Sequence, residues 1–123
     1  MSDEVRVHVR GLEVFGRHGV LAEETALGQR FVVDLTVCLT ECPGVGTDDI
    51  ADTLDYARLA DEVAAIVAGA PSRLLEHLAG RIADHVLDEP RAAWTEVTVR
   101  KPHVALPHTV GETAVTLRRG ARG

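Results

Sequence analysis

The sequence is poor in the residues that mark several large protein classes. Its 123 residues include only two cysteines, one tyrosine, one tryptophan and two phenylalanines, and 19 acidic residues outnumber 13 lysines and arginines. The formal net charge of -6 argues against a nucleic-acid partner, because proteins that bind the phosphate backbone concentrate lysine and arginine. No segment approaches the roughly 18 consecutive apolar residues of a membrane-spanning helix, so we expect no membrane partner either.

The sequence also shows neither a leader peptide nor a metal site. Residues 1–9 lack the basic and apolar stretches of a secretory signal peptide. Cys38 and Cys42 have no second cysteine or histidine pair at metal-ligand spacing, and His77 and His85 lie roughly 80° apart around one predicted helix. We therefore predict a cytoplasmic protein with two free thiols, no disulfide and no bound metal.

The spacing of apolar residues predicts four strands and two helices. Apolar and polar residues alternate in the strands, and apolar residues recur at helical spacing from Tyr56 and again after Ser72, the expected N-cap of the second helix. Gly11, Gly16 and Gly19 interrupt the first strand and indicate a bulge or a close approach of another backbone segment. The order ββααββ indicates one α+β domain over residues 1–123, with an antiparallel sheet and two helices on one face.

A four-stranded sheet has two free edges, and free edges invite pairing with another chain. The second strand, from Phe31 to Leu39, alternates without an internal proline. We predict that this strand would be an exposed edge in a monomer and that the sheet continues into neighbouring subunits. The alternative is that charged strand ends and bulges protect the edges.

Two side chains with useful chemistry stand at element ends, where functional residues often lie. Lys101 ends the third strand in phase with Val97 and Val99. It is either a surface residue or an amine at the rim of the core, where desolvation would favour the neutral form that can act as a base. Tyr56 opens the first helix and is either a rim residue with its hydroxyl in water or a proton carrier.

Two carboxylates complete the set of candidates. Glu76 lies in the first turn of the second helix, where it could interact with the helix dipole or, beside the apolar stripe, accept two N–H groups from an aminopyrimidinone. Glu24 lies in a glycine-rich loop and on its own would be read as a solvated loop residue.

The order and spacing of these motifs resemble the dihydroneopterin aldolase family from about Gly11 to Arg118. The motifs are His18-Gly19, Glu24, Gly28-Gln29, Thr53 to Tyr56, Leu74 to His77 and Lys101-Pro102. The resemblance implies the tunnelling fold, in which four subunits join their sheets into a barrel. Two such rings would stack into a homo-octamer with active sites between subunits.

The resemblance also implies how the substrate would be bound. Glu76 would accept the amino and ring N–H groups of a pterin, with Leu75 contributing backbone and Leu54 among the other substrate contacts. Arg73 stands where relatives can carry a smaller polar residue, and it could alter the mouth of the pocket.

The same resemblance implies the chemistry. Lys101, acting through a water, would remove a proton from a side-chain hydroxyl of 7,8-dihydroneopterin, and Glu24 would orient Lys101 or these hydroxyls. Tyr56 of the neighbouring subunit would carry a proton at the departing carbon. The products would be glycolaldehyde and 6-hydroxymethyl-7,8-dihydropterin, in tetrahydrofolate biosynthesis. No cofactor is expected, because the conjugated imine of the pterin can take up the electrons without a metal or a Schiff base.

Other activities of this fold stay open. Dihydroneopterin triphosphate epimerase shares the cleavage step, but its substrate needs basic groups that the sequence does not show beside Lys101. Epimerase or oxygenase side activities are compatible with the sequence. Zinc-dependent relatives such as pyruvoyltetrahydropterin synthase are disfavoured by the missing histidine ligands. A non-catalytic pterin- or purine-binding ring would need Glu76, but not Lys101 and Tyr56 together.

Overall fold

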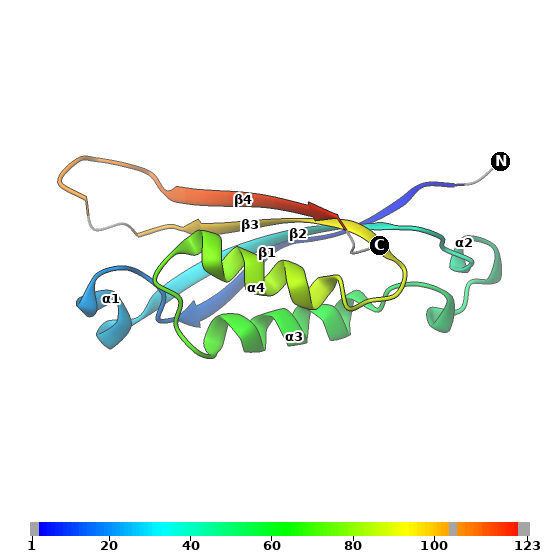
Figure 1. Ribbon diagram of the computed structural model, residues 1–123, viewed down its shortest axis with the longest axis horizontal. Coiled ribbons are helices and arrows are strands. Elements are labelled where there is room, and N and C mark those ends of the chain that lie inside the picture. The colour runs from blue at the N-terminus through cyan, green and yellow to red at the C-terminus, as the bar shows by residue number, and fades with distance from the viewer. Residues whose placement is uncertain (1–2, 104–105, 121–123) are drawn as a thin grey trace.

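The structure is a computed structural model that describes residues 3–103 and 106–120 (Figure 1). The ββααββ order of the main elements is confirmed, and three short helical segments that periodicity did not predict are inserted between them. The third strand starts at Ala92, earlier than expected from Val97. The elements are β1 Val5–Gly16, α1 Ala22–Leu27, β2 Gln29–Leu39, α2 Gly44–Thr47, the 3-10 helix η1 Ile50–Asp52, α3 Tyr56–Ala68, α4 Leu75–Val86, β3 Ala92–Lys101 and β4 Thr113–Gly120.

The four strands form one antiparallel sheet in the order β1-β2-β3-β4. The prediction that β2 would be a free edge is wrong. The two helices return the chain beside β2, so β2 pairs with β1 on one side and with β3 on the other. Within the described residues, the unpaired edges of the sheet are therefore the outer sides of β1 and β4.

Of the two features that the glycines of the first strand indicate, a bulge is present at Gly11. The register with β2 shifts between Val9 and Leu12, and Gly11 has a positive φ of 74° that L-residues rarely adopt. The N–H of Gly11 donates to Asp34 Oδ1 at 2.8 Å. The extra residue reverses the alternation, and this keeps Leu12 and Val14 on the same face as Val9.

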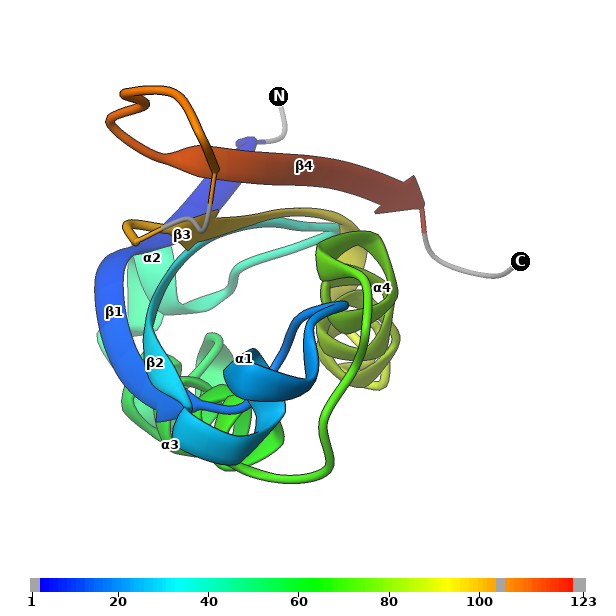
Figure 2. The same cartoon turned by 90° about the vertical axis from the view of Figure 1, so that its left-hand side faces the viewer.

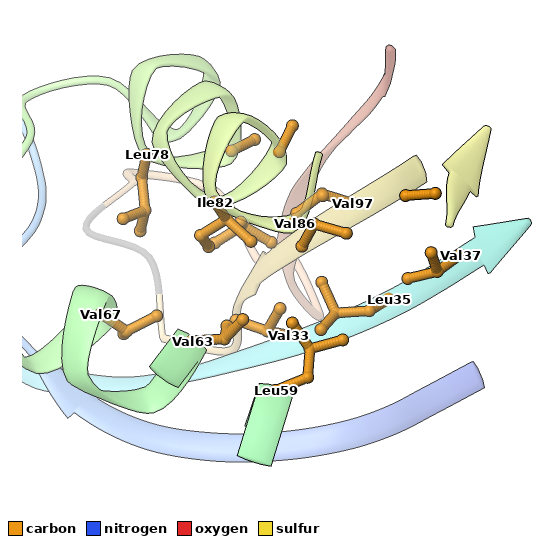
Figure 3. Close-up of a cluster of buried hydrophobic side chains, with 14 of the residues drawn as sticks. Val33, Leu35, Val37, Leu59, Val63, Val67, Leu78, Ile82, Val86 and Val97 are labelled. Atoms are coloured by element: carbon orange, nitrogen blue, oxygen red, sulfur yellow. The ribbon is translucent and has the colours of Figure 1, made fainter. Parts of the chain in front are cut away.

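Helices α3 and α4 lie side by side on one face of the twisted sheet (Figures 1 and 2). Asp55 caps α3 by accepting from the N–H groups of Ala57 and Arg58, and apolar residues at helical spacing then face β2 and β3 (Figure 3). Among the described residues, no helix is both long and apolar enough to cross a membrane. The core side chains shown include Val33, Leu35, Leu59, Val63, Val67, Leu78, Ile82, Val86 and Val97.

The direction of the helices divides the molecule into two ends. The end of α3, the start of α4, α1 and the end of β3 lie together at one end of the sheet (Figure 1). The start of α3 lies at the opposite end, together with α2 and η1. This division decides which candidate site residues can meet within one chain.

No helix among residues 3–103 and 106–120 covers the other face of the sheet (Figure 2). Polar side chains occupy much of it, and Trp94 lies between two guanidinium groups, those of Arg6 at 5.2 Å and Arg118 at 3.8 Å from its ring centroid. Thr98 and Thr116 are joined by a side-chain hydrogen bond on the same face. This face therefore carries the polar residues that alternate with the apolar residues of the strands.

Candidate functional site

Lys101 and Glu24 form an ion pair at the end of the sheet where β3 terminates. Lys101 Nζ contacts Glu24 Oε2, and the side chains are only 13% and 11% exposed. Lys101 lies in phase with the buried residues Val97 and Val99, as predicted. Glu24 does not lie in a plain loop, because residues Ala22–Leu27 form the short helix α1. An amine and a carboxylate that are this well shielded from water differ from the exposed ion pairs elsewhere on the surface.

Several groups hold the Glu24 carboxylate in place. The N–H of Leu21 donates to Oε1 and the amide of Gln29 donates to Oε2, each at 3.2 Å. The carboxylate lies directly over Gly19, where a Cβ atom would come within 2.4 Å of it. Burial alone would raise the pKa of Glu24, but the hydrogen bonds from Lys101 and Leu21, the charge of Lys101 and the bond from Gln29 outweigh it and lower this pKa.

Gln29, named above only within the Gly28-Gln29 motif and given no role there, contacts Glu24 in the site. Because a carboxylate only accepts, the Gln29 amide must turn its NH2 group toward Glu24. Its carbonyl oxygen Oε1 is then buried without a hydrogen-bond partner among the described residues. The sequence did contain a signal for this residue. Gln29 opens β2 two residues before the buried Phe31, so its amide lies on the same face of the sheet as Phe31. A ligand hydroxyl or a water is the kind of group that this oxygen could accept from.

Glu76 lies in the first turn of α4 as predicted, and it is exposed. The prediction that Ser72 caps this helix is wrong, because Leu74 is the N-cap and makes no side-chain cap bond. Ser72 is instead buried, and its carbonyl accepts from the N–H of Gly19 at 3.0 Å. This bond brings the segment before α4 next to the segment that carries Glu24.

The other three predicted residues, Leu75, Leu54 and Tyr56, differ in burial and in distance from the ion pair. Leu75, beside Glu76, is partly buried against the core. Leu54 as a whole is 2% exposed within the core, so within one chain almost none of it can contact a ligand. Tyr56 is 62% exposed at the start of α3. Val67, at the other end of the helix, lies eleven positions further on, a rise of about 16 Å. Tyr56 is therefore far from the ion pair of its own chain.

Three further predictions concern metal ligands, the two cysteines and Arg73. In the part of the chain that the structure describes, no group of three or more histidine, cysteine, aspartate or glutamate residues could hold a metal ion. Cys38 and Cys42 are both free thiols. Arg73 is exposed just before α4, on the segment that precedes Glu76.

Comparisons with known proteins identify the family. The family model of dihydroneopterin aldolase (FolB) matches residues 7–118. The dihydroneopterin aldolase of Streptomyces coelicolor is 40% identical over 114 residues and that of Bacillus subtilis 42% over 116 residues; each alignment covers 93% of this chain and 96% of the relative.

Solved structures agree with this result. The structure of Escherichia coli dihydroneopterin aldolase in complex with neopterin has a TM-score of 0.85 at 28% identity, covering 94% of this chain and 99% of that one. A Burkholderia dihydroneopterin aldolase bound to guanine has a TM-score of 0.77 at 26% identity, covering 98% and 93%. With a family match over most of its length and relatives near 40% identity, this chain belongs to the dihydroneopterin aldolase family.

Proposed function

We propose that this chain, as a single domain, cleaves 7,8-dihydroneopterin into glycolaldehyde and 6-hydroxymethyl-7,8-dihydropterin in tetrahydrofolate biosynthesis. The observation that carries the proposal is the shielded pair of Glu24 and Lys101 beside the start of the helix that bears Glu76. A protein that only bound pterins would need the exposed carboxylate of Glu76. It would have no use for a largely buried amine held against a second carboxylate.

Glu76 is the proposed anchor for the pterin ring. Neopterin and guanine, the ligands named for two structural relatives, share an amino group and a ring N–H that point the same way. A carboxylate can accept both of these donors with its two oxygens. Leu75 would contribute through its backbone, and Leu54 is the other proposed substrate contact, although only 2% of this residue is exposed in a single chain.

Lys101 is the proposed base. Acting through a water, it removes the proton of the hydroxyl on the second side-chain carbon, and the bond between the first and second carbons breaks. The second carbon becomes the aldehyde of glycolaldehyde, and the bonding electrons move into the conjugated imine of the ring. An amine accepts a proton only when it is neutral, so the ion pair must lose one proton to solvent before cleavage. Glu24 orients the amine and the substrate hydroxyls.

Tyr56 of a second subunit is proposed to return a proton to the first carbon, which restores the proton balance of the reaction. Within one chain, Tyr56 lies about 16 Å along α3 from the end of that helix that is near the ion pair. The unpaired edges of β1 and β4 offer backbone donors and acceptors to neighbouring copies. We therefore propose a ring of four subunits closed by β1–β4 pairing, and an octamer of two rings.

The experiment is to incubate the protein with 7,8-dihydroneopterin and to measure glycolaldehyde and the pterin products by chromatography. Glu24→Gln should lower turnover, whereas Glu13→Gln should leave it unchanged, because Glu13 forms an exposed ion pair with Arg30 outside the site. Release of an epimer without glycolaldehyde would instead indicate an epimerase. Activity lost with EDTA and restored by zinc would refute the metal-free reaction.

The shared site has its own test. Lys101→Ala and Tyr56→Phe subunits should each form little 6-hydroxymethyl-7,8-dihydropterin alone. Formation of this product should return when the two variants are unfolded and refolded together. Mixed rings then contain some sites with an intact Lys101 from one subunit and an intact Tyr56 from the other. Light scattering of the unmodified protein should show an oligomer, and a monomer at working concentration would refute the shared site.

A further inference from the structure

We propose that Ser72 is a positioning residue. Together with His18, it fixes the Glu24–Lys101 pair relative to Glu76. It joins the segment that carries Glu24 to the start of the helix that carries Glu76. The inference rests on the proposed function, because it assigns Ser72 a part in arranging that site. Three sets of contacts carry it.

His18 is fully buried and has both ring nitrogens bonded. Its Nε2 lies 2.6 Å from the carbonyl oxygen of Val67, and its Nδ1 accepts from the N–H of Ser72 at 2.9 Å. A carbonyl can only accept and a backbone N–H can only donate, so the hydrogen must lie on Nε2. Burial lowers the pKa of His18 more than the bond to Val67 raises it, and the charge of Arg81 lowers it further. The ring is therefore neutral, in one tautomer.

Ser72 is 3% exposed, and all three of its polar groups are bonded. Its N–H donates to His18, and its carbonyl accepts from Gly19. Its hydroxyl lies 2.8 Å from both an Arg81 nitrogen and His77 Nδ1. Arginine only donates, so the hydroxyl accepts from Arg81, and its own hydrogen is then available to His77 Nδ1. Ser72 and His18 are the buried part of this network, and buried polar groups that are all hydrogen-bonded hold one another in one arrangement.

The network reaches a site residue on each side. Gly19, held by Ser72, forms the floor beneath the Glu24 carboxylate, so a displacement of Gly19 displaces Glu24 from Lys101. His77, held by the Ser72 hydroxyl, directly follows Glu76. Because a misplacement of about 1 Å can lower turnover about 100-fold, a link of this kind bears on catalysis as well as on folding.

Two substitutions of His18 test the link, because each retains a different bond. The Asn carbonyl can take the place of Nδ1 and accept from Ser72, whereas the Gln amide can take the place of Nε2 and donate to Val67. Both variants should melt at lower temperature, since each loses one buried hydrogen bond. The Gln variant, which leaves Ser72 without its acceptor, should lose about tenfold or more in kcat, and the Asn variant should stay within about threefold of wild type. Equal losses in kcat would overturn the proposal.

Ser72→Ala provides a second, independent variant. It removes the hydroxyl but keeps both backbone bonds, to His18 and Gly19. The Glu24 end should therefore keep its geometry while the start of α4 loosens, so neopterin should bind about tenfold more weakly with little change in kcat. Unchanged binding of neopterin, measured by calorimetry, would overturn the role of this residue.

The unmodified protein separates this inference from the proposed function. If it binds neopterin but releases no glycolaldehyde from 7,8-dihydroneopterin, the proposed function is wrong, while the binding of Ser72→Ala still decides the inference. If it is active and the two His18 variants and Ser72→Ala match it in kcat and neopterin affinity, only the inference is wrong.

Discussion

Gly19→Ala is the substitution whose effect on the site can be worked out most directly from the structure. An ideal Cβ at this position would lie 2.4 Å from the carboxyl carbon and from Oε1 of Glu24, and 2.7 Å from Oε2. Ordinary van der Waals contact begins at 3.4 Å, so the carboxylate must withdraw by about 1 Å. Glu24 is held by Leu21, Gln29 and Lys101, and it cannot withdraw without lengthening at least one of these contacts.

Two separate losses are expected. The φ of Gly19 is 148°, which L-residues rarely adopt, and the strain of an alanine there should cost about 1–3 kcal/mol of stability. The displaced carboxylate should also lower turnover, by up to about 100-fold for a shift of 1 Å. Affinity for neopterin should change much less, because the proposed anchor of the ring is Glu76 and not Glu24.

Gly11→Ala is the matched control. Gly11 also has a positive φ, 74°, but a Cβ there would meet no atom within 4 Å. The control should therefore lose about 1–2 kcal/mol of stability through backbone strain and keep the wild-type turnover. Urea unfolding would give the stabilities, and glycolaldehyde release at saturating substrate would give kcat. A Gly19→Ala protein that is destabilised like the control but turns over at the wild-type rate would show that the place of Glu24 over Gly19 has no part in the reaction.

Three further outcomes are expected. Glu76→Ala should weaken neopterin binding by about 1–3 kcal/mol, whereas Lys101→Ala should lower kcat about 100-fold or more and largely keep affinity, both measured by calorimetry and product release. Tyr56→Phe should still release glycolaldehyde but form less 6-hydroxymethyl-7,8-dihydropterin, and normal product ratios at a normal rate would leave Tyr56 as a rim residue. Since folding lowers the pKa of His18, its stabilisation is complete above about pH 6.5 and is lost as the pH falls toward the folded value. Urea unfolding should show a decline of up to about 1.4 kcal/mol per pH unit, smaller in His18→Asn.

The parts of the fold that the sequence predicted are those in which one period continues over many residues. Alternation located β1 and β2, and helical spacing located α3 and α4, because each of these elements buries one face. The bulge at Gly11 was also predictable, since the alternation changes phase there. The position of β2 in the sheet was not, because strand order depends on how the helical connection crosses the face. The helix α1 escaped prediction because it has six residues and buries none of them.

In the candidate site, the position of a single residue at an element end was easier to predict than the residues that it contacts. Lys101 follows from strand phase, and Glu76 from its position at a helix start. Contacts such as those of Ser72 with His18 join positions 54 residues apart, and no local pattern encodes them. Ser72 itself was assigned to helix capping because serine before a helix usually has that role, and here the tertiary network uses its polar groups instead.

The restraint on Glu24 also bears on which group moves the proton. Its carboxylate accepts from Lys101, Leu21 and Gln29, and these bonds together keep its pKa below the ordinary value despite burial. A carboxylate with a lowered pKa is a weaker base, and one held by several donors has little freedom to approach a substrate hydroxyl. In the proposed reaction we therefore assign proton removal to Lys101, and the proposed part of Glu24 is to hold that amine where the side-chain hydroxyls arrive. We therefore propose that Glu24 orients and does not transfer the proton, and that its position depends on its contact with Gly19, on the bond from Gln29 and, through Gly19, on Ser72.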